Sequence, residues 1–219
     1  MAHKKQSKHE SEDMVDIGKE IFHFARKVPL WVWWVLVLVF GAFIFQAVFT
    51  SLSTIEYKGM TFTHEKMGEI NFYHYTYYID PTTKYNLYLR GDPRKNMIPI
   101  QENITFPSTK VDISVNTTGL ASCEDSQVGI GQLSLFLAQN KLSIESASPD
   151  PVLAQQFNVT YASCVARTGA TILVVQEGPT SEILSTGDGC YTLQVAHCEV
   201  IPVVEKFIIN ALIEARKRS

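Results

Sequence analysis

The feature that most constrains this chain is an apolar block of 22 residues, VPLWVWWVLVLVFGAFIFQAVF, which runs from Val28 to Phe49. It holds no charged residue, and Gln46 is its one strongly polar side chain. An α-helix of this length, rising about 1.5 Å per residue, reaches about 33 Å and can cross a hydrocarbon core of about 30 Å. We therefore expect a transmembrane helix over residues 28–50, with the lipid bilayer as its partner.

The block is better explained as a permanent anchor than as a cleaved signal peptide. A signal peptide has an apolar core of about 7–15 residues and a cleavage site of small residues, whereas this core is longer. Trp31, Trp33 and Trp34 crowd its first turns, where indole rings favour the headgroup boundary. These features predict a single-pass signal-anchor.

Three features predict that the amino terminus is cytoplasmic and that the domain after the anchor lies outside the plasma membrane. The flank before the block is slightly richer in Lys and Arg than the flank after it. All four cysteines follow the block, where an oxidising compartment allows disulfides. Three N-x-S/T sequons also follow it and predict glycosylation at Asn103, Asn116 and Asn158.

Composition and charge exclude two classes of protein. With 46% hydrophobic and 19% charged residues among 219, the chain is too apolar to be disordered and long enough for an anchor plus one domain. After residue 29 it has 13 basic and 17 acidic side chains. This acidic balance provides no electrostatic footprint for nucleic acid.

The segment before the anchor divides in two. Residues 1–13 are polar and mixed in charge, which predicts a disordered cytoplasmic tail. Residues 14–27 carry apolar side chains at helical spacing, which predicts a short interfacial helix leading into the span. A helix that docks on a partner is the alternative interpretation of the same pattern.

Residues 53–100 are predicted to form a β-hairpin subdomain, because they are rich in Tyr, Phe, Thr and Ile. The run NFYHYTYYID alternates two sets of side chains, and a short turn links it to YNLYLR. One hairpin cannot bury so many rings by itself, so one face must pack on the rest of the domain or on a partner. The candidate binding surface consists of Tyr73, Tyr75, Tyr77, Tyr78 and Tyr88.

From Lys110 the pattern alternates strands and helices, which predicts an α/β domain over residues 110–219. The order βαβ…ββα is loosely thioredoxin-like. Strands are expected at 111–115, 142–146, 171–176, 182–185 and 190–195, and the apolar run of the third marks it as central. Helices are expected from a Ser122 cap to about Lys141, over 151–157, and from Pro202 to Ala215. The first helix has the apolar stripe Val128, Leu133, Leu135, Phe136 and Leu137.

Four cysteines allow three pairings, and strand geometry removes one. If the segment between Cys190 and Cys198 is extended, eight steps of about 3.3 Å separate these residues by about 26 Å, whereas a disulfide needs Cα atoms about 4.4–6.8 Å apart. Two consecutive tight turns make the strand at Cys190 parallel to strand 171–176, so Cys164 and Cys190 approach the same sheet edge. We predict the bridge Cys164–Cys190, and a second bridge Cys123–Cys198 if the first strand of the domain is parallel too.

Chemistry at the cysteines is the alternative to structural bridges. A helix amino terminus near Cys123 favours a reactive thiolate, and so a membrane-tethered thiol oxidoreductase is the second interpretation, although no C-x-x-C motif is present. A zinc site built from Cys190, His197 and Cys198 would need a C-x7-C spacing unlike the usual knuckle. We predict no metal and no cofactor.

The sequence contains no motif that indicates catalysis. It lacks a G-x-S-x-G elbow, an HExxH pair and a glycine-rich phosphate loop, so no catalytic residue is predicted. Individual charges have ordinary structural interpretations. Asp188 is expected in a turn, Glu205 on a solvated helix face, and Asp92 and Arg94 in a loop.

A resemblance to known proteins rests on four segments, TFTHEKMGEINFYHYTYYI, YNLYLRGDPRKN, VDISVNTTGL and GDGCYTLQVAHCEVIPVVEKFI. Together they are similar to uncharacterised archaeal single-span membrane proteins with an exported α/β domain. The resemblance implies the same topology and brings no activity, ligand or catalytic residue. The sequence therefore predicts a membrane-anchored binding or assembly protein that meets a protein partner at the cell surface.

Overall fold

The computed structural model describes residues 29–166, 169–187 and 189–218. The predicted tail at 1–13 and interfacial helix at 14–27 lie outside these residues. The chain divides into two units, Met1–Ser53 and Thr54–Ser219. In the first unit, helix α2 spans Leu30–Ser53, where a helix over 28–50 was expected. Within the described residues, no helix combines the length and the apolar character needed to cross a membrane.

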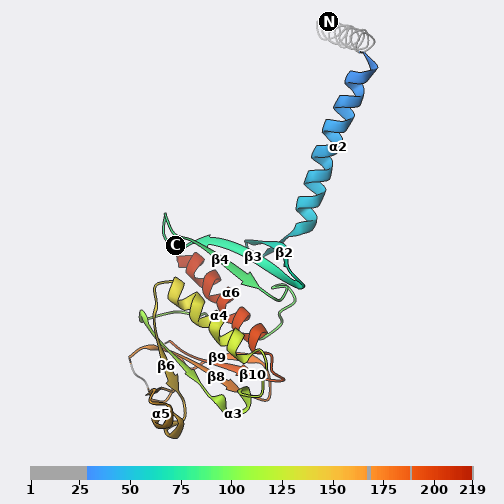
Figure 1. Cartoon of the computed structure of the whole chain (residues 1–219). Coiled ribbons are helices and arrows are strands. Elements are labelled where there is room, and N and C mark those ends of the chain that lie inside the picture. The colour runs from blue at the N-terminus through green and yellow to red at the C-terminus, as the bar shows by residue number, and fades with distance from the viewer. Residues whose placement is uncertain (1–28, 167–168, 188, 219) are drawn as a thin grey trace, which may run out of the picture. The chain divides into compact units, whose positions relative to one another are not determined.

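The second unit begins with a four-stranded antiparallel sheet of order β1-β2-β3-β4 (Figure 1). Its strands are β1 (Thr54–Tyr57), β2 (Met60–Met67), β3 (Ile70–Tyr78) and β4 (Lys84–Leu89). Gly59 and Gly68 form the first two turns with positive φ, a conformation that glycine adopts without steric cost. The hairpin expected within 53–100 is the β3–β4 pair, so the sequence indicated half of this sheet.

A mixed six-stranded sheet of order β7-β6-β5-β8-β10-β9 follows. Its strands are β5 (Lys110–Val115), β6 (Ser143–Ser148), β7 (Thr160–Tyr161), β8 (Thr171–Glu177), β9 (Glu182–Ser185) and β10 (Cys190–Val195). Strand β8 lies between β5 and β10 and is parallel to both. This arrangement confirms the central strand and the strand directions on which the cysteine argument depends.

The helices of this unit are α3 (Thr117–Leu120), α4 (Ser126–Gln139), α5 (Pro151–Phe157) and α6 (Val200–Arg218). The expected cap at Ser122 is wrong. Its hydroxyl donates instead to the carbonyl of Gly119 at 2.7 Å, and α4 begins only at Ser126. The reason is that the chain forms two successive turns after Leu120: the N–H of Cys123 donates to the carbonyl of Leu120 at 3.1 Å, and the N–H of Ser126 donates to the carbonyl of Cys123 at 3.1 Å.

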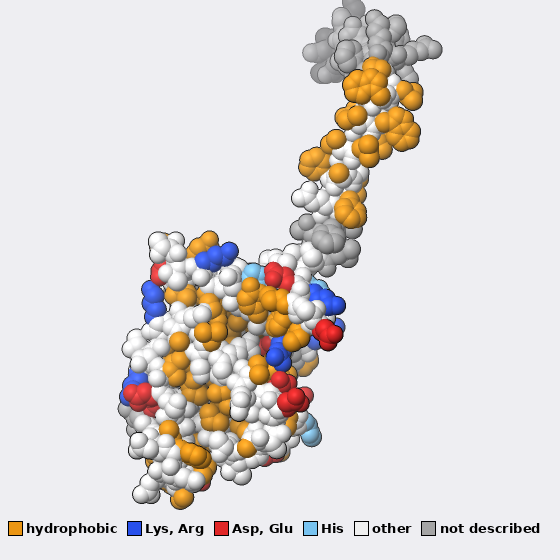
Figure 2. All heavy atoms as spheres, in the orientation of Figure 1, with side chains coloured by type: hydrophobic (Ala, Val, Ile, Leu, Met, Phe, Trp, Pro, Cys, Tyr) orange, Lys and Arg blue, Asp and Glu red, His pale blue; other side chains and the backbone are white. Residues whose placement is uncertain are grey.

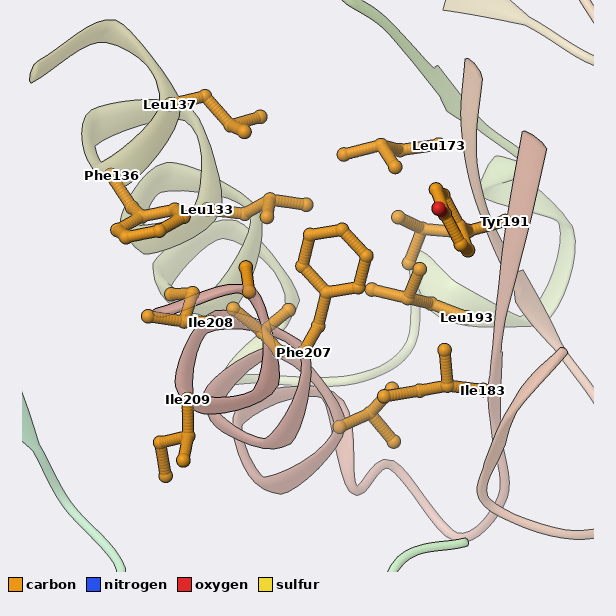
Figure 3. Close-up of a cluster of buried hydrophobic side chains, with 14 of the residues drawn as sticks. Leu133, Phe136, Leu137, Leu173, Ile183, Tyr191, Leu193, Phe207, Ile208 and Ile209 are labelled. Atoms are coloured by element: carbon orange, nitrogen blue, oxygen red, sulfur yellow. The ribbon is translucent and has the colours of Figure 1, made fainter. Parts of the chain in front are cut away.

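Helices α4 and α6 lie between the two sheets (Figure 1), and one hydrophobic core joins the three layers. Phe207 of α6 points into this core beside Tyr191 of β10, with ring centroids 5.9 Å apart (Figure 3). The apolar stripe predicted on α4 is correct for Leu133, Phe136 and Leu137, which are buried. It is wrong for Val128 and Leu135, which are exposed, because the helix buries one side only.

The residues at the two ends of helix α5 determine where this helix starts and stops. Asp150 accepts the N–H groups of Val152 at 2.7 Å and Leu153 at 3.3 Å, Pro151 occupies the first turn, and Asn158 ends the helix in a left-handed conformation. We expect Asp150→Ala to lower the free energy of unfolding by about 1 kcal/mol in urea titrations, because two N–H groups lose their acceptor. The control Asp150→Asn retains an acceptor and should stay near wild type. Equal stability of all three proteins would contradict the role of the cap.

Candidate functional site

A cleft of about 830 Å³ opens at the carboxyl ends of β8 and β10. The residues that follow these strands, including Thr180, Ser181 and His197, line one side. The segment 90–99 and the first turns of α6 line the rest. In open α/β sheets, ligands bind in the crevice outside the carboxyl ends of the parallel strands, and this cleft has that position.

Glu205 lines the cleft from α6, although it is only 2% exposed. Its carboxylate accepts the backbone N–H of Arg90 and, at 3.1 Å, that of Gly91. Burial raises the pKa of Glu205 to about 7, while these hydrogen bonds offset part of the shift. The carboxylate therefore ties the segment after β4 to α6 and changes its charge near neutral pH.

The expectation that Glu205 lies on a solvated helix face is wrong. Ile201 and Ile209, one turn before and one turn after it on the same side of α6, are both buried. That spacing was visible in the sequence and could have identified Glu205 as a buried charge. Residue type alone predicts a solvated position for Glu205, since acidic side chains are mostly exposed.

The cleft is lined by both charged and apolar side chains. Arg90 pairs with Asp125 at 3.1 Å, and both side chains are partly exposed. Asp92, which was expected to be a simple loop charge, binds the guanidinium of Arg94 at 2.8 Å, and this hydrogen bond lowers the pKa of Asp92. Lys95 adds a cation, while apolar surface comes from side chains such as Met97, Ile98 and Ile201. The cleft can thus hold a ligand that has both polar groups and apolar surface.

The wall after β10 has an unusual backbone. His197 and Cys198 have φ values of 50° and 61°, in the left-handed region that non-glycine residues seldom occupy. The N–H of Glu199 closes this turn on the carbonyl of Ala196 at 2.9 Å. The disulfide of Cys198 anchors the same turn to the chain after β5. His197 is therefore held in place at the cleft by its neighbours in the chain.

The cysteines pair as the strand geometry predicts. Cys164 bonds Cys190 with Cα atoms 5.6 Å apart, and Cys123 bonds Cys198 at 5.3 Å. No cysteine is free in the described part of the chain. A thiol oxidoreductase would need a free thiol at Cys123, but this sulfur is part of a disulfide. A zinc site would need the thiolates of Cys190 and Cys198, and both of these sulfurs are also part of disulfides. Among the described residues, no three His, Cys, Asp or Glu side chains are grouped to hold a metal ion.

The five tyrosines of the predicted binding surface do not share one face. Tyr73, Tyr75 and Tyr77 are half-buried against the core, and Asn140 donates to the Tyr77 hydroxyl at 2.8 Å. Burial raises the pKa of Tyr77 well above its ordinary value. Tyr78 and Tyr88 lie on the opposite face, where the ring of Tyr88 stacks on His74 with centroids 4.6 Å apart. The structure therefore divides this set between an internal and an external surface.

The predicted glycosylation residues are placed in three different settings. Asn103 is exposed in the segment before β5. The side chain of Asn116 accepts the N–H of Thr118 at 3.1 Å and caps α3. Asn158 terminates α5. Asp188, the expected turn residue, lies outside the described residues.

The cleft thus brings Glu205 of α6 next to the segment that holds Arg90 and Lys95, which lies more than 100 residues earlier in the chain. No family model, curated protein or solved structure matches this chain.

Proposed function

We propose that this chain is a membrane-anchored binding protein of the cell surface, whose cleft beside Glu205 holds the ligand. In this proposal the amino terminus lies in the cytoplasm, and the unit from Thr54 onward lies outside the cell. The observation that carries the proposal is the cleft itself, about 830 Å³ at the carboxyl edge of parallel strands. Clefts of this size accommodate small organic ligands or the end of a peptide.

The anchor is proposed from the apolar block of residues 28–50, and the exposed side chains described on α2 are in keeping with it. Large apolar side chains are exposed along the helix, among them Leu30, Phe40 and Phe45 at 76%, 71% and 72%. On the side that Figure 2 displays, hydrophobic side chains follow the described length of the helix. Water disfavours so much exposed apolar surface, whereas lipid accommodates it. The resemblance to archaeal single-span proteins implies the same anchoring.

Export is supported by the two disulfides, since such bridges persist in oxidising compartments. Both lie in the unit that follows α2. Their distribution fits a structural role, because each one ties the end of a strand to a distant loop. The loose likeness to the thioredoxin fold stays a prediction, and it supplies no active thiol while Cys123 is bridged.

The binding proposal can be tested by methyl NMR of the full chain in detergent micelles, with ¹³C-labelled methionine methyl groups. Met97 lines the cleft and is 83% exposed, whereas Met67 lies on the small sheet and serves as an internal control. In a fragment library of amines, carboxylates and aromatic compounds, we expect some members to shift the Met97 resonance saturably and leave Met67 unchanged.

A cleft-filling variant makes this experiment specific. Thr180 is exposed at the cleft, so Thr180→Trp should occupy the space and abolish the shifts of Met97 without unfolding the protein. Intact methionine spectra in the absence of fragments would report correct folding. A library that never shifts Met97, or shifts that persist in Thr180→Trp, would rule out the cleft as the binding site.

A further inference from the structure

The turn between β10 and α6 has a backbone that its own side chains disfavour. His197 and Cys198 are its central residues, with φ values of 50° and 61°, and the N–H of Glu199 closes it on the carbonyl of Ala196 at 2.9 Å. Turns with positive φ at both central positions favour glycine and asparagine, because larger side chains crowd the backbone there. This turn therefore depends on its surroundings to hold it in this conformation.

The disulfide between Cys123 and Cys198 is the covalent part of that hold. Cys198 lies after β10 and before α6, so it belongs to neither element. Its partner Cys123 lies in the chain before α4, and the two Cα atoms are 5.3 Å apart. Opening this bridge would untie the turn from the chain before α4. His197 and Cys198 would then be free to return to ordinary backbone angles.

The two disulfides differ in how readily a thiol can approach them. Cys198 is exposed, whereas its partner Cys123 is only 7% exposed. In the other bridge, Cys190 is 1% exposed within β10, and Cys164 packs against the same small apolar cluster. The rate of thiol–disulfide exchange depends on access to the sulfur that is attacked. A thiol should therefore open the first bridge before the second, and it should attack at Cys198.

We infer that the bridge Cys123–Cys198 is a redox switch that fixes or releases one wall of the cleft. Ala196, His197 and Glu199 all line the cleft, so the turn forms part of that wall. With the bridge closed, the wall is fixed. With the bridge open, the turn relaxes and the wall loses its shape. The effect on a ligand rests on the proposed binding function, whereas the opening of the turn does not.

The reductant of this switch is a dithiol. One of its thiolates attacks the sulfur of Cys198, forms a mixed disulfide and releases the sulfur of Cys123 as a thiolate. The second thiol then attacks the sulfur of the reductant in the mixed disulfide, and Cys198 leaves as a thiolate. Each cysteine takes up one proton from the two thiols of the reductant. Two electrons thus pass from the dithiol, which becomes a cyclic disulfide, to the bridge.

The experiment incubates the full chain in detergent micelles with dithiothreitol, a small dithiol. Free thiols are trapped at intervals with N-ethylmaleimide and located by peptide mass spectrometry. We expect thiols at Cys123 and Cys198 to appear about tenfold faster than those at Cys164 and Cys190. In the partly reduced protein, hydrogen exchange of the amides at 196–200 should accelerate about tenfold, because the closing hydrogen bond of the turn is lost. Exchange in β8 should stay unchanged and verify that the domain remains folded.

The variant His197→Gly tests the part played by the backbone. Glycine adopts positive φ without steric cost, so the turn should stay closed more of the time after reduction, and exchange at 196–200 should accelerate less than in wild type. Equal acceleration in both proteins would refute the release of backbone strain.

The outcomes also separate the redox switch from the proposed function. Equal rates of reduction for the two bridges, or faster reduction of Cys164–Cys190, would overturn the switch. Selective reduction that leaves exchange at 196–200 unchanged would overturn it as well. Neither measurement needs a ligand, so a cleft that binds no fragment would remove the proposed function and leave these results standing.

Discussion

Replacing both Cys123 and Cys198 by alanine is expected to lower the free energy of unfolding by about 4.5 kcal/mol. The bridge closes a loop with a sequence separation of 75 residues, so its loss releases a large conformational entropy in the unfolded chain. For a unit of this size, the melting temperature should fall by roughly 10 °C or more. Thermal and urea unfolding of the detergent-solubilised protein, followed by intrinsic fluorescence, would measure both effects.

The second bridge provides the matched control. Cys164 and Cys190 are separated by 26 residues, and the same entropy relation gives about 3.5 kcal/mol for replacing both by alanine. The Cys123–Cys198 variant should therefore be the less stable of the two by about 1 kcal/mol. It should also weaken fragment binding, because His197 beside Cys198 lines the cleft. Two variants that match wild type in stability would show that the bridges do not stabilise the domain.

The second large effect is a dependence of stability on pH that originates at Glu205. The pKa of this side chain is about 7 in the folded protein, against an ordinary value of 4.5. The folded state thus holds the proton more tightly than the unfolded state. The resulting stability is fully present below about pH 4.5 and is lost as pH rises through 7. Its size follows from the difference between the two values and is about 3 kcal/mol.

This dependence can be isolated by substitution. The variant Glu205→Gln keeps the side-chain shape and removes the titration, so its stability should change little between pH 5 and pH 8 from this source. Wild type should lose up to about 3 kcal/mol over that range. Glu145→Gln removes an exposed carboxylate on β6 that pairs with Lys110, and it should retain the wild-type slope. Urea titrations at several pH values measure the slopes, and equal slopes for wild type and Glu205→Gln would refute the assignment.

The prediction for Glu205 also bears on binding. Ionised Glu205 accepts two backbone N–H groups of the segment that lines the cleft. Protonation removes the charge on this acceptor and weakens the tie between that segment and α6. Fragment affinity at Met97 should therefore depend more strongly on pH between 6 and 8 in wild type than in Glu205→Gln.

Local sequence was sufficient for much of the secondary structure. Helix α5 has the predicted bounds because Asp150, Pro151 and Asn158 carry its start and stop signals. Strands β8, β9 and β10 were located by the turns between them, and two tight turns made β10 parallel to β8. The pairing of Cys164 with Cys190 followed from that direction. Each of these features depends on residues close together in the chain.

Predictions from local sequence were wrong where packing between distant segments determines the structure. The start of α4 lies at Ser126 because turns occupy residues 120–126, and Val128 and Leu135 are exposed because of the position of α4 against α6. Alternation along β3 correctly separated Tyr77 from Tyr78, yet alternation cannot state which side meets the core. That choice depends on α4 and α6, which the chain forms much later.

By itself, the sequence indicated the apolar segment, the mixed α/β domain and the Cys164–Cys190 bridge, because hydrophobic period located the strands and turn chemistry set the direction of β10 relative to β8. The Cys123–Cys198 bridge followed only on the condition that β5 is parallel as well, which the structure confirms. The tertiary structure alone decided the cleft and the burial of Glu205. The N–H groups that bind its carboxylate belong to Arg90 and Gly91, which are 115 and 114 residues away in the chain. A local sequence pattern cannot predict contacts over such a separation, because the burial of a charged side chain depends on which remote segments fold over it.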